Sequence, residues 1–221
     1  MKQVKIAGLI ATIILSLALG GHSQGMRGRG GPHAPQLFGA FNPVVGTGAQ
    51  YQATTKDRPM EFAYVVVGKE DVEGSTGYWM EIRTSGPAMP GEMVMKQLVV
   101  TGGDKPQIKR MIMQSAGRPP MEMPTAMMNM QRSGGGQAGD TSPGVKVGSE
   151  SVTVPAGTFD CEHYRKQTAE GTVDVWVSTK VSPYGTVKMT SGQMTMVLEK
   201  VLSNETSHIK GEPQKFEMPK F

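Results

Sequence analysis

From residue 50 onward the chain is built of short runs in which apolar and polar residues alternate, and glycine, proline, aspartate or serine separates one run from the next. A period of two puts successive side chains on opposite faces of a strand, whereas a helix needs apolar residues three or four positions apart. Valine, threonine and tyrosine, which favour strands, are frequent in these runs. The pattern predicts strands at residues 49–54, 60–69, 77–84, 92–101, 107–114, 150–154, 158–167, 172–177, 185–190 and 193–202.

Most of the connections between these runs are too short for a parallel crossover, which takes roughly a dozen residues, so neighbouring strands should be antiparallel. Several runs are apolar on both faces: residues 60–68 carry Phe62 and Tyr64 on one face and Ala63 and Val65 on the other. We therefore expect a mainly β fold, a single antiparallel and strongly curved sheet in the form of a half-barrel, with one or two short helices. A two-sheet sandwich fits the same alternation and is the alternative.

The composition supports one packed core and excludes several classes of protein. The chain has 221 residues, of which 38% are hydrophobic, and 29 glycines and 15 prolines make up about a fifth of it, which disfavours long helices. A single cysteine cannot form an intramolecular disulfide, and no Cys-x-x-Cys motif is present. Disulfide scaffolds, zinc modules and thioredoxin-like redox sites are therefore excluded.

The first 23 residues have the pattern of a secretory signal peptide. Lys2 and Lys5 precede an uncharged, mostly apolar run at residues 6–20, and small residues follow it. The apolar run is shorter than the roughly 20 residues that span a bilayer, so we expect cleavage and no transmembrane anchor afterwards. The protein is then expected to be periplasmic or secreted.

The rest of the chain divides by composition. Residues 24–47 are predicted to be a flexible linker rich in glycine and proline, with a short helix at residues 37–41. The β domain covers residues 48–203 and is interrupted by a loop rich in methionine, proline and glycine at residues 117–148, in which residues 125–131 can form two helical turns. Residues 204–221 are predicted to be a charged tail, and its proline-interrupted part, residues 210–221, is expected to fray.

The charge pattern does not indicate a nucleic-acid partner. The formal net charge is only +4, and it falls when Lys2 and Lys5 leave with the signal peptide. Arg27 and Arg29 lie among glycines, but two arginines release few counterions. We expect no nucleic acid to bind.

One face of the predicted strands between residues 60 and 101 is apolar enough to hold an apolar or amphipathic ligand, such as a lipid or an acyl chain. Unbranched methionines on that face would adapt to varied ligands. The predicted ligand-binding residues are Phe62, Tyr64, Tyr78, Met80, Ile82, Met93, Met95 and Val99.

Methionine is unusually frequent, with 18 residues against 6 phenylalanines, 5 tyrosines and 2 tryptophans. In strands a Met-x-Met spacing shows only that one face is apolar, but in the predicted loop packing is a weaker explanation. Thioethers are soft ligands that prefer Cu(I), which makes a copper-binding protein the alternative function. The predicted metal ligands are Met121, Met123, Met127, Met128 and Met130.

Cys161 and His163 lie two positions apart on one predicted strand, where a thiol and an imidazole could act as nucleophile and base. No residue nearby is expected to lower the pKa of the thiol, and a cysteine beside Phe159 packs readily as a small hydrophobe. Asp160 and Glu162, on the opposite face, fit a solvated strand surface. An enzyme is therefore the third hypothesis, after ligand binding and copper binding, and we expect no catalytic site.

Several stretches resemble an uncharacterised family of exported bacterial β-proteins, a domain of unknown function. The resemblance runs from about residue 48 to residue 202 and includes Gly77-Tyr78-Trp79-Met80-Glu81, Val152-Thr153-Val154-Pro155-Ala156-Gly157-Thr158-Phe159, and Pro183-Tyr184-Gly185-Thr186-Val187. Some such proteins are similar to the curved sheets of periplasmic lipoprotein carriers. The resemblance implies a fold and a compartment, and it carries no established activity.

Overall fold

The computed structural model describes residue 35 and residues 37–55, 58–101, 106–124, 144–168, 171–192 and 194–216. The chain divides into two units, Met1–His33 and Ala34–Phe221, and every described residue belongs to the second. The predicted signal peptide, residues 1–23, and the two helical turns predicted at residues 125–131 lie outside the described residues.

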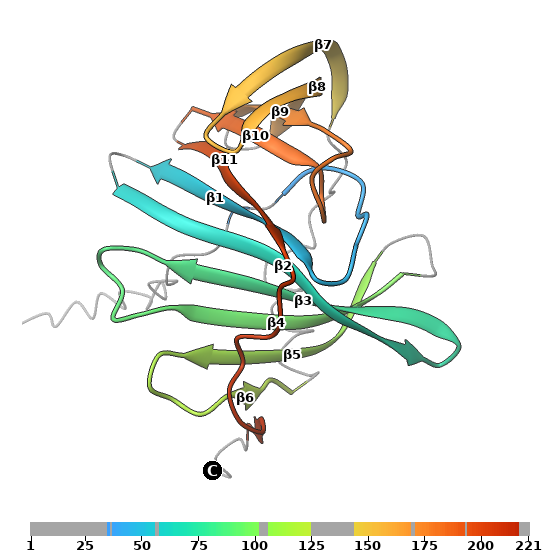
Figure 1. Cartoon of the computed structure of the whole chain (residues 1–221), viewed down its shortest axis with the longest axis vertical. Coiled ribbons are helices and arrows are strands. Elements are labelled where there is room, and N and C mark those ends of the chain that lie inside the picture. Colours follow the sequence, from blue (N-terminus) through green and yellow to red (C-terminus); the bar gives the residue numbers. More distant parts are fainter. Residues whose placement is uncertain are drawn as a thin grey trace, which may run out of the picture. The chain divides into compact units, whose positions relative to one another are not determined.

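The described residues form strands and no helix, and so contain no helix of the length and hydropathy that a membrane span needs (Figure 1). The strands are β1 Thr47–Thr55, β2 Arg58–Val72, β3 Ser75–Ser85, β4 Met93–Val100, β5 Gln107–Ser115, β6 Met121–Glu122, β7 Val145–Val154, β8 Gly157–Thr168, β9 Gly171–Val177, β10 Thr186–Ser191, β11 Met194–Ser203 and β12 Gln214–Lys215.

Within the described residues all twelve strands belong to one open sheet, in the order β12-β6-β5-β4-β3-β2-β1-β11-β10-β9-β8-β7. Two antiparallel meanders, β1 to β6 and β7 to β11, are joined where β1 pairs with β11. The predicted single, mainly antiparallel sheet is confirmed and the sandwich alternative is wrong. The sheet is nevertheless mixed, because β12 runs parallel to β6.

All ten predicted strands are present, each displaced by only a few residues at its ends. The alternation of side chains was therefore a sound guide to the strands. The two-residue strands β6 and β12 were not predicted, because two residues are too few to show a period. The loop predicted at residues 117–148 is shorter than expected, since β6 and the first residues of β7 lie inside it.

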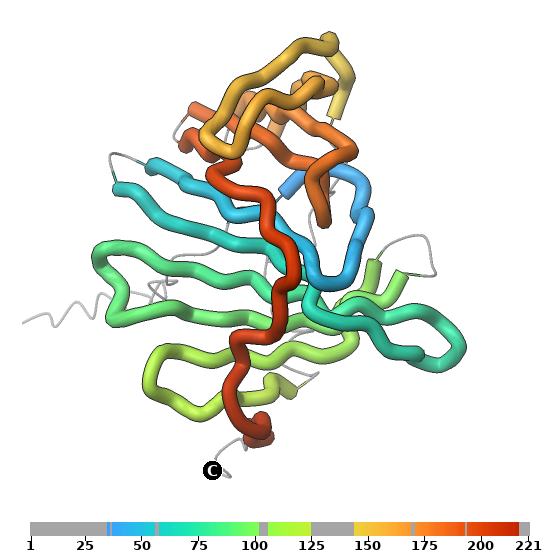
Figure 2. The backbone as a smooth tube through the Cα atoms, in the orientation of Figure 1, coloured from blue at the N-terminus to red at the C-terminus, as the bar shows by residue number. Residues whose placement is uncertain are grey.

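The main core lies where the β7 end of the sheet curls back toward β1 and β11 (Figure 2). The Ala156 amide, in the turn between β7 and β8, donates to the Leu198 carbonyl of β11 at 3.3 Å, across the curl. Tyr51, Val175 and Leu198, from β1, β9 and β11, are fully buried in this core. Curling buries one face of the sheet without a second sheet.

The segment before β1 packs into this core without regular secondary structure. The short helix predicted at residues 37–41 is absent. Leu37 and Phe38 are buried, and the Phe38 carbonyl accepts a hydrogen bond from the Thr186 hydroxyl at 3.1 Å. Gly39 has a φ of +146°, and a Cβ there would lie 2.0 Å from the Tyr184 carbonyl oxygen. The backbone of this segment therefore bonds to β10 and to the loop before it instead of to itself, which excludes a helix.

Candidate functional site

The eight residues predicted to bind a ligand do share one face of β2, β3 and β4. Ile82 of β3 lies directly opposite Tyr64 of β2 on one side and Met95 of β4 on the other. Directly opposed residues of antiparallel strands point to the same side of a sheet, so these three side chains form a row across the strands. The pairing of Tyr78 with Val99 places those two on the same face.

The β2 end of this face is filled by the protein itself. Phe62 and Tyr64 are buried in the main core, and the Tyr64 hydroxyl donates to the Pro35 carbonyl oxygen. The Tyr64 ring meets the Tyr51 ring edge-on, with centroids 5.9 Å apart, and burial raises the pKa of Tyr64 well above its ordinary value. Both of these predicted ligand-binding residues are therefore core residues.

Toward β6 the same face becomes accessible. The row that begins at Tyr64 and Ile82 continues through Met95 and Met113 to Met121, each directly opposite the next. Tyr64 is 3% exposed, the three residues in the middle are half-buried, and Met121 at the end is 38% exposed. This face therefore becomes accessible beyond the predicted site, toward β5 and β6.

Methionine dominates this face from β3 to β6. Its residues differ in exposure, since Met80 and Met111 are buried whereas Met121 is exposed. A second row runs from Met80 through Gln97 to Met111, and the Met123 amide continues it by donating to the Met111 carbonyl at 2.9 Å. We call this surface the methionine face; it consists of Met80, Met93, Met95, Met111, Met113, Met121 and Met123.

The structure thus brings together two sets of residues that the sequence analysis kept apart. Met121 and Met123, predicted as metal ligands in a loop, lie on the same face as Met93 and Met95, predicted as ligand-binding residues in a strand, with β5 between the two pairs. Met127, Met128 and Met130, the other predicted metal ligands, fall outside the described residues. The sequence analysis did not assign Met111 and Met113 to a site. Their Met-x-Met spacing was visible, but only the register of β5 with its neighbours shows which face they join.

At the far margin of the face an exposed cation lies near an aromatic ring. Lys69 of β2 is opposite Tyr78 of β3, so both point to the same side as the methionines. The Tyr78 ring meets the Phe41 ring edge-on, with centroids 6.1 Å apart. The face therefore combines an apolar floor with a positive charge at its edge.

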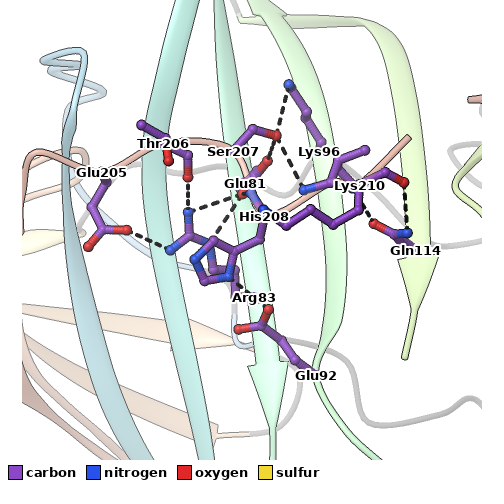
Figure 3. Close-up of polar contacts among 11 residues, drawn as sticks. Glu81, Arg83, Glu92, Lys96, Gln114, Glu205, Thr206, Ser207, His208 and Lys210 are labelled. Atoms are coloured by element: carbon purple, nitrogen blue, oxygen red, sulfur yellow. Dashed lines mark hydrogen bonds and ion pairs between the residues drawn. The ribbon is translucent and has the colours of Figure 1, made fainter. Parts of the chain in front are cut away.

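The opposite face of the same strands carries the buried Glu81 and Arg83 and is crossed by residues 204–216, which we call the C-terminal strap (Figures 1 and 3). Glu81 is fully buried there, and its carboxylate accepts bonds from the Arg83 side chain at 3.2 Å, from the His208 amide at 3.0 Å and from the Ser207 hydroxyl. Arg83 in turn donates to Glu205 at 2.7 Å and to the Thr206 carbonyl at 2.6 Å.

Further contacts hold the strap as far as β6. The Lys210 amide donates to the Gln114 side-chain oxygen at 2.8 Å, and the Gln114 side-chain nitrogen donates to the Lys210 carbonyl at 3.1 Å. The Gln214 amide donates to the Pro120 carbonyl at 2.9 Å. The sequence analysis predicted that residues 210–221 fray, but residues 210–216 bond to the sheet. Nearer its start the strap supplies further hydrogen bonds to the buried Glu81–Arg83 pair.

An open cleft of about 300 Å³ lies beside the strap. Gln50 and Glu61 line one side, and Lys200, Glu205 and His208 line others. The sequence analysis missed this cleft because its residues come from four distant segments. Most of its polar groups already bond to one another: Gln50 bonds to Glu61, and the His208 ring bonds to Glu92 at 2.9 Å. The cleft is therefore mainly the edge of the region that the strap covers.

A family model for a domain of unknown function, DUF4412, matches residues 54–217, from the end of β1 past β12. The chain belongs to the DUF4412 family. This confirms the resemblance to a domain of unknown function, and it assigns no activity. The predicted relation to periplasmic lipoprotein carriers is not shown by the match and stays a prediction. No protein with a curated description matches the DUF4412 chain.

Two solved structures are similar to the DUF4412 chain at a low level. One is a Bacteroides fragilis protein inferred to be exported, with a YmcC-like fold; it is 16% identical, with a TM-score of 0.34, over 76% of this chain and 99% of that one. The other is a Parabacteroides distasonis protein inferred to be a lipoprotein; it is 13% identical, with a TM-score of 0.35, over 76% of this chain and 100% of that one. Likeness at this level carries no argument about function.

In the DUF4412 chain Cys161 and His163 have different partners. Cys161 is buried in the main core, where its thiol contacts the Phe159 carbonyl at 3.5 Å, and burial raises its pKa to about 11. His163 bonds to Asp174 at 2.7 Å and stacks on Trp176, with ring centroids 4.4 Å apart. A thiol with so high a pKa is a poor nucleophile. Among the described residues no group of three or more His, Cys, Asp or Glu is placed to hold a metal ion.

Proposed function

We propose that this DUF4412 protein is an exported, non-catalytic binding domain that holds the acyl chain of an amphipathic lipid on its methionine face. The observation that carries the proposal is the row from Ile82 through Met95 and Met113 to Met121, which is continuous with the core yet gains exposure toward β6. In this proposal the row is the inner wall of a half-barrel, as in periplasmic lipoprotein carriers.

The chemistry of the face suits a flexible apolar chain better than a rigid ligand. Methionine is unbranched and has three rotatable bonds, so its side chain can repack around ligands of different shapes. The distance from β3 to β6 is three inter-strand spacings, or about 14 Å. An extended acyl chain that crosses these strands can therefore make several consecutive contacts. Burying such a chain is favourable by about 25 cal/mol for each Å² of apolar surface removed from water.

Lys69 supplies the polar end of this binding mode. It is exposed and lies opposite Tyr78, at the margin of the face away from Met121. A lysine ammonium there can pair with a carboxylate or phosphate head group that remains in water while the acyl chain lies along the methionines. We therefore propose an anionic lipid, and a fatty acid is the simplest probe.

Export and the lack of catalysis belong to the same proposal. The basic residues Lys2 and Lys5 followed by the apolar run at residues 6–20 support a cleaved signal peptide and a periplasmic or secreted protein. The burial and raised pKa of Cys161 support a binding role over an enzymatic one. Recovery of Met1 by N-terminal sequencing of the mature protein would contradict export.

The test is uptake of a fluorescent fatty acid by the purified protein, with native mass spectrometry to count bound molecules. Met95→Lys places an ammonium in the middle of the row, and we expect it to abolish uptake, because an unpaired charge on an apolar surface is costly. Thr195→Lys adds the same charge at an exposed position of β11 and should bind like the wild type. Circular dichroism establishes that both variants are folded.

Three results would contradict the proposal. The first is no uptake by the wild type, the second is equal uptake by the two lysine variants, and the third is a fluorescent signal without a bound mass. Loss of affinity in Lys69→Ala for a fatty acid, with no loss for the corresponding uncharged alcohol, would support the assignment of the head-group position.

A further inference from the structure

Three methionines on consecutive strands have their side chains on one side of the sheet and in direct register. Met113 of β5 is opposite Met95 of β4 and opposite Met121 of β6. The Cβ atoms of directly opposed residues are about 4.5–5.5 Å apart, and a methionine side chain is longer than that distance. The outer two thioethers can therefore lean toward the central one, so that three sulfur atoms meet above Met113.

We propose that Met95, Met113 and Met121 form a Cu(I) site on the β4–β6 part of the sheet. Thioether sulfur is a soft donor that selects Cu(I) over zinc, calcium or magnesium, and a soft monovalent ion is satisfied by two to four such donors. Three neutral donors leave the ion with a single positive charge. At a half-exposed position, solvent screens that charge, whereas a fully buried ion would need a counter-charge.

The surroundings of the row fit a site that a metal ion can enter. Met121 is 38% exposed at the end of the row, and Met95 and Met113 are half-buried, so the ion has an open side from which to approach. The Gln97 side-chain amide donates to the Met95 sulfur at 2.9 Å, which holds that thioether in place and leaves its second lone pair for the ion.

Two more methionines, Met111 and Met123, lie next to the row. The Met123 amide donates to the Met111 carbonyl at 2.9 Å, which continues the pairing of β6 with β5 by two residues beyond Met121. Met123 is half-buried, so its thioether is the nearest candidate for a fourth ligand. This site differs from the loop site that the sequence predicted, because two of its three ligands belong to long strands.

The inference does not rest on lipid binding. An acyl chain uses the apolar character of the whole face, and leucine would serve it as well as methionine. Copper uses the sulfur atoms, which leucine lacks. Substitution of methionine by leucine therefore separates the two activities, since volume and polarity are nearly conserved at a cost below about 1.5 kcal/mol for each site.

The experiment is a titration of the full mature chain with Cu(I) under anaerobic, reducing conditions, in competition with a chromophoric Cu(I) chelator. We expect one Cu(I) for each chain and, by X-ray absorption, a first coordination shell of sulfur. The triple variant M95L/M113L/M121L should lose competition with the chelator. Met121→Leu alone, at the most exposed position, should weaken binding by at least about tenfold.

A matched control removes thioethers from the core. Met189 of β10 and Met196 of β11 are also directly opposed, and both are buried. The double variant M189L/M196L should bind Cu(I) like the wild type, and both multiple variants should keep the circular dichroism spectrum of the wild type. If the triple variant does not fold, Met121→Leu decides the test alone.

Four results would overturn the assignment. These are no Cu(I) retained by the wild type, equal loss in the core control, full retention in the triple variant, and loss only when Met127, Met128 and Met130 are replaced. The last result would place copper on the loop. Failure of fatty-acid uptake leaves the copper titration unaffected, so failure of one proposal can be told from failure of the other.

Discussion

The two faces of β3 to β5 differ in how they are covered. On one face Glu81 and Arg83 are buried, bond to each other, and bond to particular groups of the strap. On the other face the methionines offer similar thioethers, and accessibility rises from Met80 to Met121. Directional polar bonds specify one partner in one position, whereas flexible apolar side chains accept many. The first face therefore stabilises a fixed arrangement, and the second is suited to binding.

The largest expected effect is on the strap face. Glu81→Ala removes the buried carboxylate that pairs with Arg83, which keeps only Glu205, and leaves the Ser207 hydroxyl and His208 amide without this acceptor. Removing one partner of a buried pair costs about 3–5 kcal/mol, and we expect that loss in urea unfolding. Glu61→Ala, at an exposed site on the same face, should cost less than about 1 kcal/mol. Equal losses in the two variants would show that the buried pair does not hold the strap.

A related variant distinguishes the loss of attraction from the cost of an isolated charge. The double variant E81L/R83M replaces the pair by apolar side chains, and such replacements are often neutral. We expect it to recover much of the stability that Glu81→Ala loses, while the strap becomes accessible to proteolysis. A double variant as unstable as the single one would mean that the strap bonds themselves carry the stability.

The second-largest expected effect is a difference in the cost of alanine substitution between the buried and the exposed end of the methionine face. Met80 is 3% exposed, so Met80→Ala should cost about 2–5 kcal/mol through lost burial and a cavity. Met121 is 38% exposed, and Met121→Ala should change the free energy of unfolding by less than about 0.5 kcal/mol. Thermal or urea unfolding of the two variants checks both values. Similar costs at the two positions would contradict an accessible end of the face.

The smallest effect is a pH dependence at the edge of the strap face. Arg110 donates to Glu122 at 2.7 Å, and this hydrogen bond lowers the pKa of Glu122. A lowered pKa in the folded state stabilises the fold above the ordinary carboxyl pKa, and this contribution disappears as the pH falls through the folded value. Glu122→Gln should therefore cost less than about 1 kcal/mol at pH 7, since Arg110 is exposed, and less than that at pH 3. Urea unfolding at both pH values tests this, and a cost that does not vary with pH would contradict it.

Much of the fold could be predicted from the sequence because strands leave a local signal. The alternation in residues 60–69 and 77–84 predicted β2 and β3 and put Tyr64 and Ile82 on one face. Exposure was harder to predict along that face, because it depends on where the sheet curls and on what residues 37–41 cover. Nothing in the local pattern around Phe62 distinguishes a core position from a ligand-binding one.

The strap and the methionine face could not be predicted, because each depends on distant pairs. Proline and charge in residues 204–216 are typical of a frayed end, and their partners Glu81 and Arg83 lie more than a hundred positions earlier. Likewise, Met121 belongs beside Met95 only through the register of β5 between them. Alternation predicts faces within a strand, but register arises from the assembled sheet.

The pairing of β1 with β11 has a consequence for the order in which the sheet assembles. Thr47 is opposite Ser203, so this ladder joins the first long strand to the last. Pairing over so long a separation is slow, because a large loop must close before any contact forms. Until β11 has been made, β1 presents an unpaired edge to solvent, which is a template for association with other chains. The nascent protein therefore has its greatest risk of aggregation while it lacks only its last strands, and a holdase chaperone that covers β1 would act in that interval.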